Sequence, residues 1–289
     1  KNISRSRPTL ELNPFYKLNA DSRRVHVGAN VDLSFGNGKA VRVSPDVKAQ
    51  YVFSDSYVLY AKATGGRQLN DFRRLETYNP YLDPGQEVRD TYEQLNAGLG
   101  FKASPTPGLW FDIFGGYQNL KDDLYQSADQ WIGGSGANYI ALGQTNTDNF
   151  YAGIKASYEY KDLFALSAGG TYYHWDTDNK GTDSGASSYD EALLMKPEFD
   201  FGIHAEVHPI PALWLNAGYQ YTRRAERYSV AYGKSIPAVS NLSLGATYKI
   251  FKGISAYVKA DNLLNKKYQY YLYYPVEGIN FVGGLSFQF

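Results

Sequence analysis

The sequence lacks cysteine altogether, contains a single methionine, and has 29 basic residues balanced by 29 acidic residues. Without cysteine there are no disulfides and no thiol chemistry. A formal net charge of +0 offers no basic surface for nucleic acid, so no nucleic-acid partner is expected. No apolar run approaches the ~20 residues that a transmembrane helix needs. A secretory signal peptide is not visible either, and the chain begins at Lys1 rather than at methionine.

Helical periodicity is nearly absent, whereas alternation of apolar and polar residues runs through the whole chain. In NLSLGATYKI, Leu244 and Ala246 share one parity while Ser243 and Thr247 share the other. A period of two predicts a strand with one apolar face and one polar face. About 13 such segments are present, each long enough for a tilted strand to cross a bilayer. They cover residues 8–19, 24–35, 41–53, 57–67, 92–103, 109–120, 149–160, 163–175, 197–208, 213–224, 240–250, 254–263 and 279–289.

The connections between these segments alternate between short and long. Short ones cover residues 54–56, 104–108, 161–162, 209–211 and 251–253, and long ones cover about 68–91, 121–148, 176–196, 225–239 and 264–278. Short turns on one side and long loops on the other are typical of outer-membrane barrels. Small residues at mid-strand on the apolar parity, such as Ala156 and Ala217, fit a lipid-facing wall better than the interdigitated core of a soluble sandwich. The sequence therefore predicts an all-β, antiparallel transmembrane barrel of about 12–14 strands, a single domain over 1–289, in the bacterial outer membrane.

The alternation also predicts which side chains face lipid and which face the lumen. Aromatic residues of the apolar parity form two belts at opposite strand ends, as expected for the two membrane interfaces. The residues predicted to face lipid include Leu242, Leu244, Ala246, Leu213, Leu215, Ala217, Ile203, Ala205, Ile154 and Ala156. The residues predicted to face the lumen include Ser243, Thr247, Asn216, Gln220, Asp200, Glu206, Lys155 and Glu159. A slip of one residue would move several charges into hydrocarbon together, which disfavours any other register.

The last hairpin has a more specific signature. The stretch ISAYVKADNLLNKKYQ precedes a short loop and then INFVGGLSFQF, with Asn262, Leu263, Asn265, Lys266, Tyr268, Phe281 and Phe289 as its matching residues. This hairpin resembles the C-terminal end of TonB-dependent receptors. The resemblance implies a wall of an outer-membrane receptor, and its terminal aromatic resembles the signal by which such barrels are recognised for assembly. Asn favours turn geometry, so the motif is expected to end a strand at the membrane surface.

Two features depart from a complete member of that family. Such a receptor has an N-terminal plug domain and about 22 strands, and neither a plug nor a TonB-contacting stretch is visible in this sequence. The C-terminus lies on the short-turn side, so an odd strand count places Lys1 outside the cell, whereas single-chain bacterial barrels have even counts. Either KNISRS continues a strand whose start is missing, or 8–19 is not a wall strand and the count is 12. We favour N-terminal strands or a plug that precede Lys1.

Few constellations point to chemistry. In HAEVH, His204, Glu206 and His208 share the lumen face, but strand geometry places the two histidines about 13 Å apart. No metal site, cofactor or enzyme is therefore expected, since no nucleophile, base and orienting group can be assembled locally. The lumen-facing candidates are Lys155, Glu159, Asp200, Glu206, Lys259 and Asp261. The loop residues that could contact an extracellular ligand or protein are Trp131, Tyr139, Tyr270, Tyr271, Tyr273 and Tyr274, although such loops can also simply fold on one another.

Two functions follow from this reading. The first is solute transport across the outer membrane by the C-terminal part of a receptor-like barrel. The alternative is a plugless barrel of 12–14 strands that acts as a passive pore or as a structural subunit of an outer-membrane complex. Outer-membrane lipid is the expected partner in both cases, with other outer-membrane or surface proteins as further candidates. TonB is expected as a partner only if a plug precedes this chain.

Overall fold

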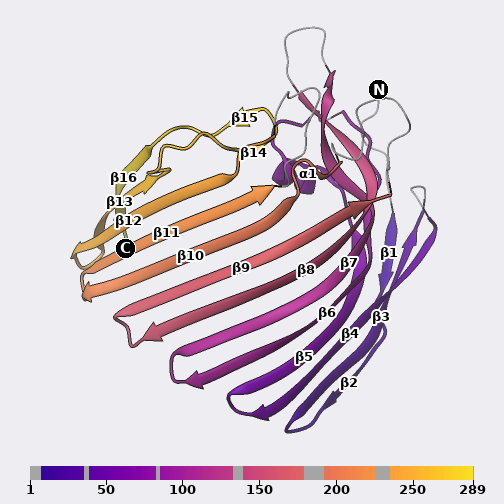
Figure 1. The fold of residues 1–289 in the computed structure, drawn as a ribbon, viewed down its shortest axis with the longest axis horizontal. Coiled ribbons are helices and arrows are strands. Elements are labelled where there is room, and N and C mark those ends of the chain that lie inside the picture. Colours follow the sequence, from indigo (N-terminus) through magenta and orange to yellow (C-terminus); the bar gives the residue numbers. More distant parts are fainter. Residues whose placement is uncertain are drawn as a thin grey trace.

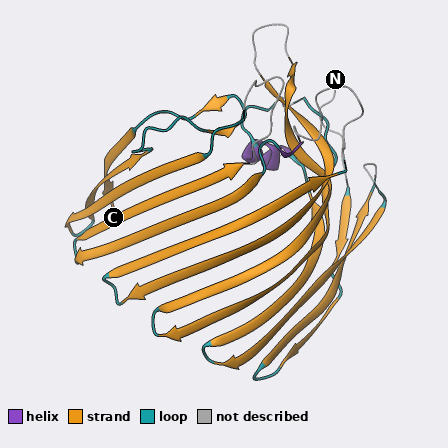
Figure 2. Cartoon of the chain, viewed as in Figure 1, coloured by secondary structure: helices purple, strands orange, loops and turns teal. Residues whose placement is uncertain are grey.

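The computed structural model describes residues 8–35, 39–82, 85–132, 139–178, 192–224 and 235–288, and these form an antiparallel sheet of 14 strands. Figure 1 shows the sheet as one curved wall, and Figure 2 shows how little of the chain is helix. The strands of the wall are β1 (Thr9–Leu12), β2 (Phe15–Asn19), β3 (Arg23–Ser34), β4 (Val41–Ser54), β5 (Tyr57–Gln68), β6 (Thr91–Thr106), β7 (Leu109–Ile132), β8 (Tyr139–Tyr160), β9 (Phe164–Thr177), β10 (Pro197–Ile210), β11 (Leu213–Arg224), β12 (Val239–Phe251), β13 (Ile254–Asp261) and β16 (Asn280–Phe287).

The order of the strands in the wall follows the order of the chain. Because β1 and β2 both pair with β3, on either side of Asn13 and Pro14, the 14 strands fill 13 positions. These positions coincide with the 13 predicted segments, and the alternative count of 12 is wrong because residues 9–19 pair with β3. Among the described residues, the wall ends at β1 and β2 on one side and at β16 on the other. The KNISRS stretch and Phe289 lie outside the described residues.

Tight turns join the strands at one end of the wall, as predicted. They cover residues 20–22, 55–56, 107–108, 161–163, 211–212 and 252–253. Gly108 (φ +81°) and Gly253 (φ +83°) supply the left-handed backbone that two-residue hairpin turns require. Side chains other than glycine rarely adopt these angles, so the turn residues help to fix the register of each hairpin.

The pairing registers preserve the predicted faces from strand to strand. Ala205 pairs with Ala217, which pairs with Leu244, which in turn pairs with Ala260. One residue along, Glu206 pairs with Asn216 on the opposite face. The ten residues predicted to face lipid share one face with Leu99, Val43 and Phe281, which are 67%, 62% and 68% exposed. The eight residues predicted to face the lumen lie on the other face.

The predicted loop over 121–148 is wrong, because most of it continues the wall. Strand β7 extends to Ile132 and β8 starts at Tyr139, so the two form a long hairpin. Register shifts interrupt this hairpin at Leu120/Asp123 and at Ser127/Trp131. Each bulge inserts extra residues and reverses the parity, which hides the period of two from a reading of the sequence.

The long connections pack against each other at the opposite end of the wall. Their described residues include a short helix, α1 (Phe72–Tyr78), which the alternation did not predict, and a small hairpin of β14 (Gln269–Tyr271) and β15 (Tyr274–Pro275). Ile140, Leu194, Ile236 and Leu272 form a buried apolar cluster there, drawn from four separate segments. In the described part of the chain, no helix is long and apolar enough to cross a membrane.

Candidate functional site

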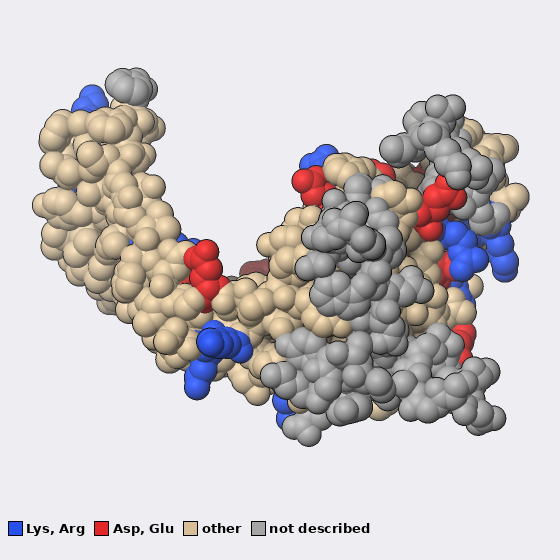
Figure 3. All heavy atoms as spheres, turned by 90° about the horizontal axis from the view of Figure 1, so that it is seen from above, with Lys and Arg blue, Asp and Glu red and all other residues tan. Residues whose placement is uncertain are grey.

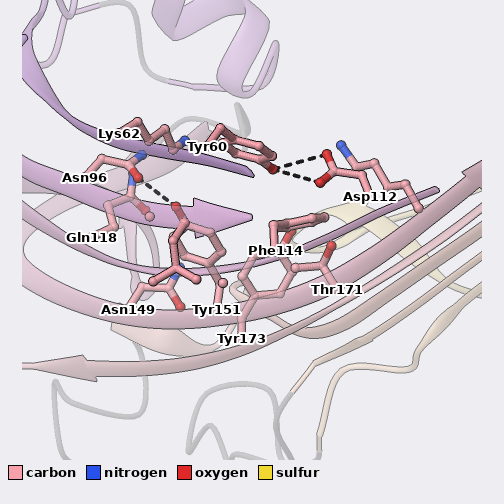
Figure 4. Close-up of a pocket in the computed structure, with 14 residues that line it drawn as sticks. Tyr60, Lys62, Asn96, Asp112, Phe114, Gln118, Asn149, Tyr151, Thr171 and Tyr173 are labelled. Carbon is pink, nitrogen blue, oxygen red and sulfur yellow. Dashed lines mark hydrogen bonds between the residues drawn. The ribbon is translucent and has the colours of Figure 1, made fainter. Parts of the chain in front are cut away.

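The inner face of the wall contains a polar hollow of about 360 Å³ that spans five strands, β5 to β9. Figure 4 shows its side chains converging from neighbouring strands, and Figure 3 shows the open space between the two arms of the wall seen from above. The residues of the polar face that line the hollow are Tyr60, Lys62, Asn96, Gly98, Asp112, Phe114, Gln118, Asn149, Tyr151, Lys155, Thr171 and Tyr173. We call this set the inner hollow.

Tyr60 and Asp112 form one side of the inner hollow. The Tyr60 hydroxyl on β5 donates to the Asp112 carboxylate on β7, at 2.9 Å from Oδ1 and 3.1 Å from Oδ2. Strand β6 lies between them and contributes Gly100, where a Cβ would lie 2.4 Å from Cζ of Tyr60. The ring of Tyr60 therefore lies flat across a glycine in order to reach the second strand. The Lys102 ammonium lies 5.3 Å from the centroid of this ring.

The same arrangement recurs on the other side of the inner hollow. The Tyr151 hydroxyl on β8 donates to Asn96 Oδ1 on β6 at 2.8 Å, again across β7. Gly116 makes room for it, because a Cβ there would lie 2.5 Å from the hydroxyl oxygen. Phe114 covers Gly153 in the same way, at 2.6 Å from a Cβ placed on that glycine. Aromatic rings that cover cross-strand glycines are a recognised means of stabilising sheets.

The inner hollow offers hydroxyl, amide, ammonium and carboxylate groups beside aromatic faces. Such a surface can bind a polar organic molecule through hydrogen bonds and ring contacts. Among the described residues, no group of three or more His, Asp or Glu side chains is placed to hold a metal ion.

The structure places the predicted lumen residues along the whole length of this face. Lys155 lines the inner hollow, with its ammonium 5.3 Å from the Phe114 ring centroid. Asp200 lines a neighbouring hollow of about 570 Å³, and Glu159 lies nearer the tight turns. Glu206 Oε1 lies 2.7 Å from His208 Nε2, and Lys259 Nζ lies 2.8 Å from Asp261 Oδ2. These residues are not gathered into one site, and their role in passage remains a proposal.

Of the six predicted loop aromatics, the structure describes the side chains of Tyr270, Tyr271, Tyr273 and Tyr274. Tyr274 stacks on Tyr81 with ring centroids 3.5 Å apart and an interplanar angle of 4°, while Tyr271 meets the same ring edge-on at 5.8 Å. The Tyr270 hydroxyl donates to Gln220 Oε1 at 3.3 Å, and the Tyr273 backbone N–H donates to Gln269 Oε1 at 2.9 Å. The loops thus fold on one another. The side chains of Trp131 and Tyr139 lie outside the described residues.

Buried polar groups hold these loops in place. Gln126 Oε1 accepts from the Leu272 backbone N–H at 2.9 Å and from Asn79 Nδ2 at 3.0 Å. The Tyr78 hydroxyl donates to the Leu124 carbonyl at 3.1 Å, and burial together with the nearby Asp123 carboxylate raises the pKa of Tyr78. Buried hydrogen bonds of this kind fix loop geometry because leaving either partner unpaired is costly.

The motif that carries the family resemblance forms a turn, as predicted. Asn262 adopts φ 52° and is 4% exposed. Its Nδ2 donates to the carbonyls of Lys266 (3.0 Å) and Glu277 (2.8 Å), and its Oδ1 accepts from the Lys266 N–H at 3.0 Å. Asn262 therefore ends β13 and anchors the following loop to the start of β16.

Residues of the inner hollow other than Lys155 were not identified from the sequence. The aromatics of the membrane belts belong to the apolar parity, whereas Tyr60, Phe114, Tyr151 and Tyr173 belong to the polar parity. A usable signal was present, since inward-facing rings and inward-facing glycines alternate on neighbouring strands.

Comparison with known proteins gives information on the fold. No family model matches the chain, and no curated protein sequence matches it. Among solved structures, the pyoverdine outer-membrane receptor FpvA of Pseudomonas aeruginosa aligns with a TM-score of 0.66 at 16% identity, over 98% of this chain and 42% of its own length. The ferric enterobactin receptor PfeA of the same species gives 0.67 at 14% identity, over 98% and 45%. The copper transporter OprC gives 0.58 at 16% identity, over 93% and 45%.

The chain has the barrel fold of TonB-dependent outer-membrane receptors. It spans less than half the length of each of these receptor structures. The resemblance seen in the last hairpin is confirmed at the level of the fold, and the fold is that of an outer-membrane β-barrel wall. At this low identity, a shared fold does not establish which substrate or partner this chain has.

Proposed function

We propose that this chain forms wall strands of a receptor-like barrel that transports a solute across the outer membrane. The observation that carries the proposal is the polar face, which is continuous from strand to strand below the bulges and contains the inner hollow. An apolar outer face stands in lipid while the polar face contacts the solute. The last hairpin further supports an assignment to the C-terminal part of such a receptor.

The chemistry of the inner hollow favours a polar organic solute that carries several oxygen or nitrogen acceptors. Tyr60, Tyr151 and Tyr173 present hydroxyls and ring faces, and Asn96 and Gln118 present amides. The similar structures include receptors for pyoverdine and ferric enterobactin, and a copper transporter. We propose that the solute of this chain is likewise one that is taken up by a dedicated receptor. FpvA has also been solved with pyocin S2, so a surface protein is a reasonable second partner.

The alternative is a passive pore or a structural subunit, and an uptake assay distinguishes it. The gene, as it occurs in its genome, is expressed in a strain that lacks its own ferric-siderophore receptors, and uptake of labelled complexes is measured with and without a protonophore. Receptor function predicts saturable uptake that the protonophore abolishes. Uptake that is linear in concentration and insensitive to the protonophore would instead indicate a passive pore.

Variants connect that assay to the site. Tyr60→Ala and Tyr151→Ala should lower uptake by roughly tenfold or more, since each removes a ring and a hydroxyl from the inner hollow. Tyr158→Ala is the matched control, because Tyr158 lies on the outer face, where it pairs with Leu166. Equal uptake by all three variants at equal barrel yield would contradict the proposed role of the inner hollow.

A further inference from the structure

Two neighbouring strands, β6 and β7, are bulged at the same height near the long-loop end of the wall. The registers shift at Thr64/Gly66 between β5 and β6, at Glu93/Leu95 between β6 and β7, and at Leu120/Asp123 between β7 and β8. A β-bulge bends its strand and increases the local twist. These bulges therefore bend the outer ends of β6 and β7, and β5 follows β6 because the two strands stay paired there.

The consequence is a break between β4 and β5. Their ladder stops at Asp46–Thr64, although β4 continues to Val41 along β3, and β5 continues to Gln68 along β6. We call the unpaired edge of β4 at residues 41–45, opposite residues 65–68 of β5, the β4 notch. The two strands still touch at its inner end, where a Cβ on Gly65 would lie 2.7 Å from Ser44 Cβ. Asn30 on β3 bridges it, with its Nδ2 donating to the Gly65 carbonyl at 2.7 Å.

Backbone groups at the free edge of β4 are directed into the notch. Ser34 N–H donates to Ala40 O, and Val52 N–H donates to Ser22 O, both at 2.8 Å, so the even-numbered residues of β4 bond to β3. Alternation in an antiparallel pair directs the backbone groups of Val41, Val43 and Pro45 toward the notch instead. Because proline has no backbone N–H, Pro45 places no unpaired donor there. The N–H groups of Val41 and Val43 have no strand partner among the described residues, and such edge groups can bind anions.

A cavity of about 360 Å³ lies at this edge, lined in part by Lys39, Arg42 and Lys121. Its carboxylate is Asp122, whose Oδ2 lies 3.3 Å from Arg42 Nη2 and whose Oδ1 lies 2.7 Å from Arg89 Nη2. Lys121 Nζ lies 3.8 Å from Asp178 Oδ2. Three cationic side chains against one lining carboxylate leave the cavity positive, with room for a phosphate group.

The ring of Tyr92 forms the inner boundary of the cavity. It is 3% exposed, and the Arg42 guanidinium lies 4.6 Å from its centroid. This contact holds the guanidinium in place, because a cation over an aromatic face is electrostatically favoured. The position of the Arg42 charge is thus set before any ligand arrives.

The outer boundary of the cavity is apolar and faces away from the lumen. The Val41 and Val43 side chains are 56% and 62% exposed on the face that carries the lipid-facing residues, and Phe35 beside them is 59% exposed. A positive cavity at the outer end of an apolar wall is placed where lipid headgroups meet hydrocarbon. The combination matches an amphipathic anion rather than a freely soluble one.

We propose that the β4 notch binds a phosphate group in the headgroup of an outer-leaflet lipid, whose acyl chains lie along Val41 and Val43. Lys39, Arg42 and Lys121 neutralise the phosphate, and the free edge N–H groups donate to its oxygens. The site requires the wall to stand in a membrane, but it is independent of which solute the barrel passes. A negative result in the uptake assay would therefore not contradict the proposed lipid site.

The test uses the full chain folded in detergent and native mass spectrometry with a phosphorylated bacterial glycolipid. Lys39→Gln combined with Lys121→Gln should weaken binding by roughly 25-fold, since each lysine at an anionic surface contributes about fivefold. The control is Lys161→Gln combined with Lys252→Gln, which removes two lysines from the tight turns at the other end. Heat-modifiable migration confirms that each variant is folded.

Three results would overturn the proposal. Unchanged lipid binding by the Lys39/Lys121 variant is the first, and equal binding of the same lipid after removal of its phosphates is the second. The third is binding of inorganic phosphate as tight as that of the lipid, which would show a free-anion site. Selective loss in the notch variant, together with a requirement for the lipid phosphate, supports it.

Discussion

Tyr60 on β5 reaches Asp112 on β7 by lying across Gly100 on the intervening strand, with 2.9 Å between the hydroxyl and Oδ1. This contact ties three strands of the inner face together through one side chain. It exists only because the middle strand has no Cβ at that point. The inner hollow is therefore shaped as much by glycines as by the rings that cover them.

Substitution of that glycine should have a measurable cost. In Gly100→Ala, the added Cβ would lie 2.4 Å from Tyr60 Cζ, so the ring must move and its hydrogen bond to Asp112 is lost. We expect a decrease of about 1.5–3 kcal/mol in the free energy of unfolding, the range for a hydrogen bond to a charged group. Urea denaturation of the detergent-folded barrel measures it.

Gly202→Ala is the matched control, because a Cβ at Gly202 on the same face meets no atom within 4 Å. It should be neutral or stabilising by about 0.4–1 kcal/mol. In a Tyr60→Ala background, the effect of Gly100→Ala should disappear. A similar loss in both backgrounds would show that the glycine acts through something other than Tyr60.

Asn262 should be sensitive in two separable ways. Asn262→Gly keeps the left-handed backbone (φ 52°) but removes three side-chain hydrogen bonds, so we expect a loss of about 2–4 kcal/mol. Asn262→Ala should lose about 1–2 kcal/mol more, because a Cβ disfavours that backbone. Asn265→Gly (φ 49°) is the comparison and should change stability less. If Asn262→Gly unfolds at the same urea concentration as the parent chain, the hydrogen bonds do not anchor the loop.

Tyr78 gives a prediction about alkaline pH. Burial raises its pKa in the folded chain, so the unfolded chain releases this proton first, and the stabilisation is complete below the unfolded pKa of about 10. It is lost as the pH rises beyond that value toward the folded pKa. Tyr78→Phe cannot ionise, and loses only the bond to the Leu124 carbonyl, about 1 kcal/mol. The advantage of the parent chain over Tyr78→Phe should shrink from pH 9 to pH 11 in urea denaturation; a constant difference would argue against this burial.

The wall itself could be predicted from the sequence because a period of two is a local property. Each of the 13 segments shows its apolar and polar parity without reference to its neighbours, and the tight turns then fix the register. The positions of Lys155 and Asp200 on the polar face follow directly from that pattern.

Features that depend on contacts between strands were not predictable in the same way. The long hairpin of β7 and β8 was hidden because the bulges at Leu120 and Ser127 reverse its parity. The link between Tyr60 and Asp112 requires the register of three strands, and the β4 notch requires a ladder to end while both of its strands continue. The helix α1 is too short for its periodicity to be distinguished from a loop.

The central claim, that one face of this wall meets lipid and the other a polar lumen, is tested most directly by arginine substitutions on adjacent residues. Ala217 and Ala246 lie on the apolar face, and Asn216 and Thr247, their neighbours in sequence, lie on the polar face. An arginine at mid-bilayer costs about 2–4 kcal/mol, so Ala217→Arg and Ala246→Arg should reduce the yield of heat-modifiable folded barrel on a gel, while Asn216→Arg and Thr247→Arg should assemble like the parent chain. Equal yields from the two pairs would contradict the assignment of faces on which this account depends.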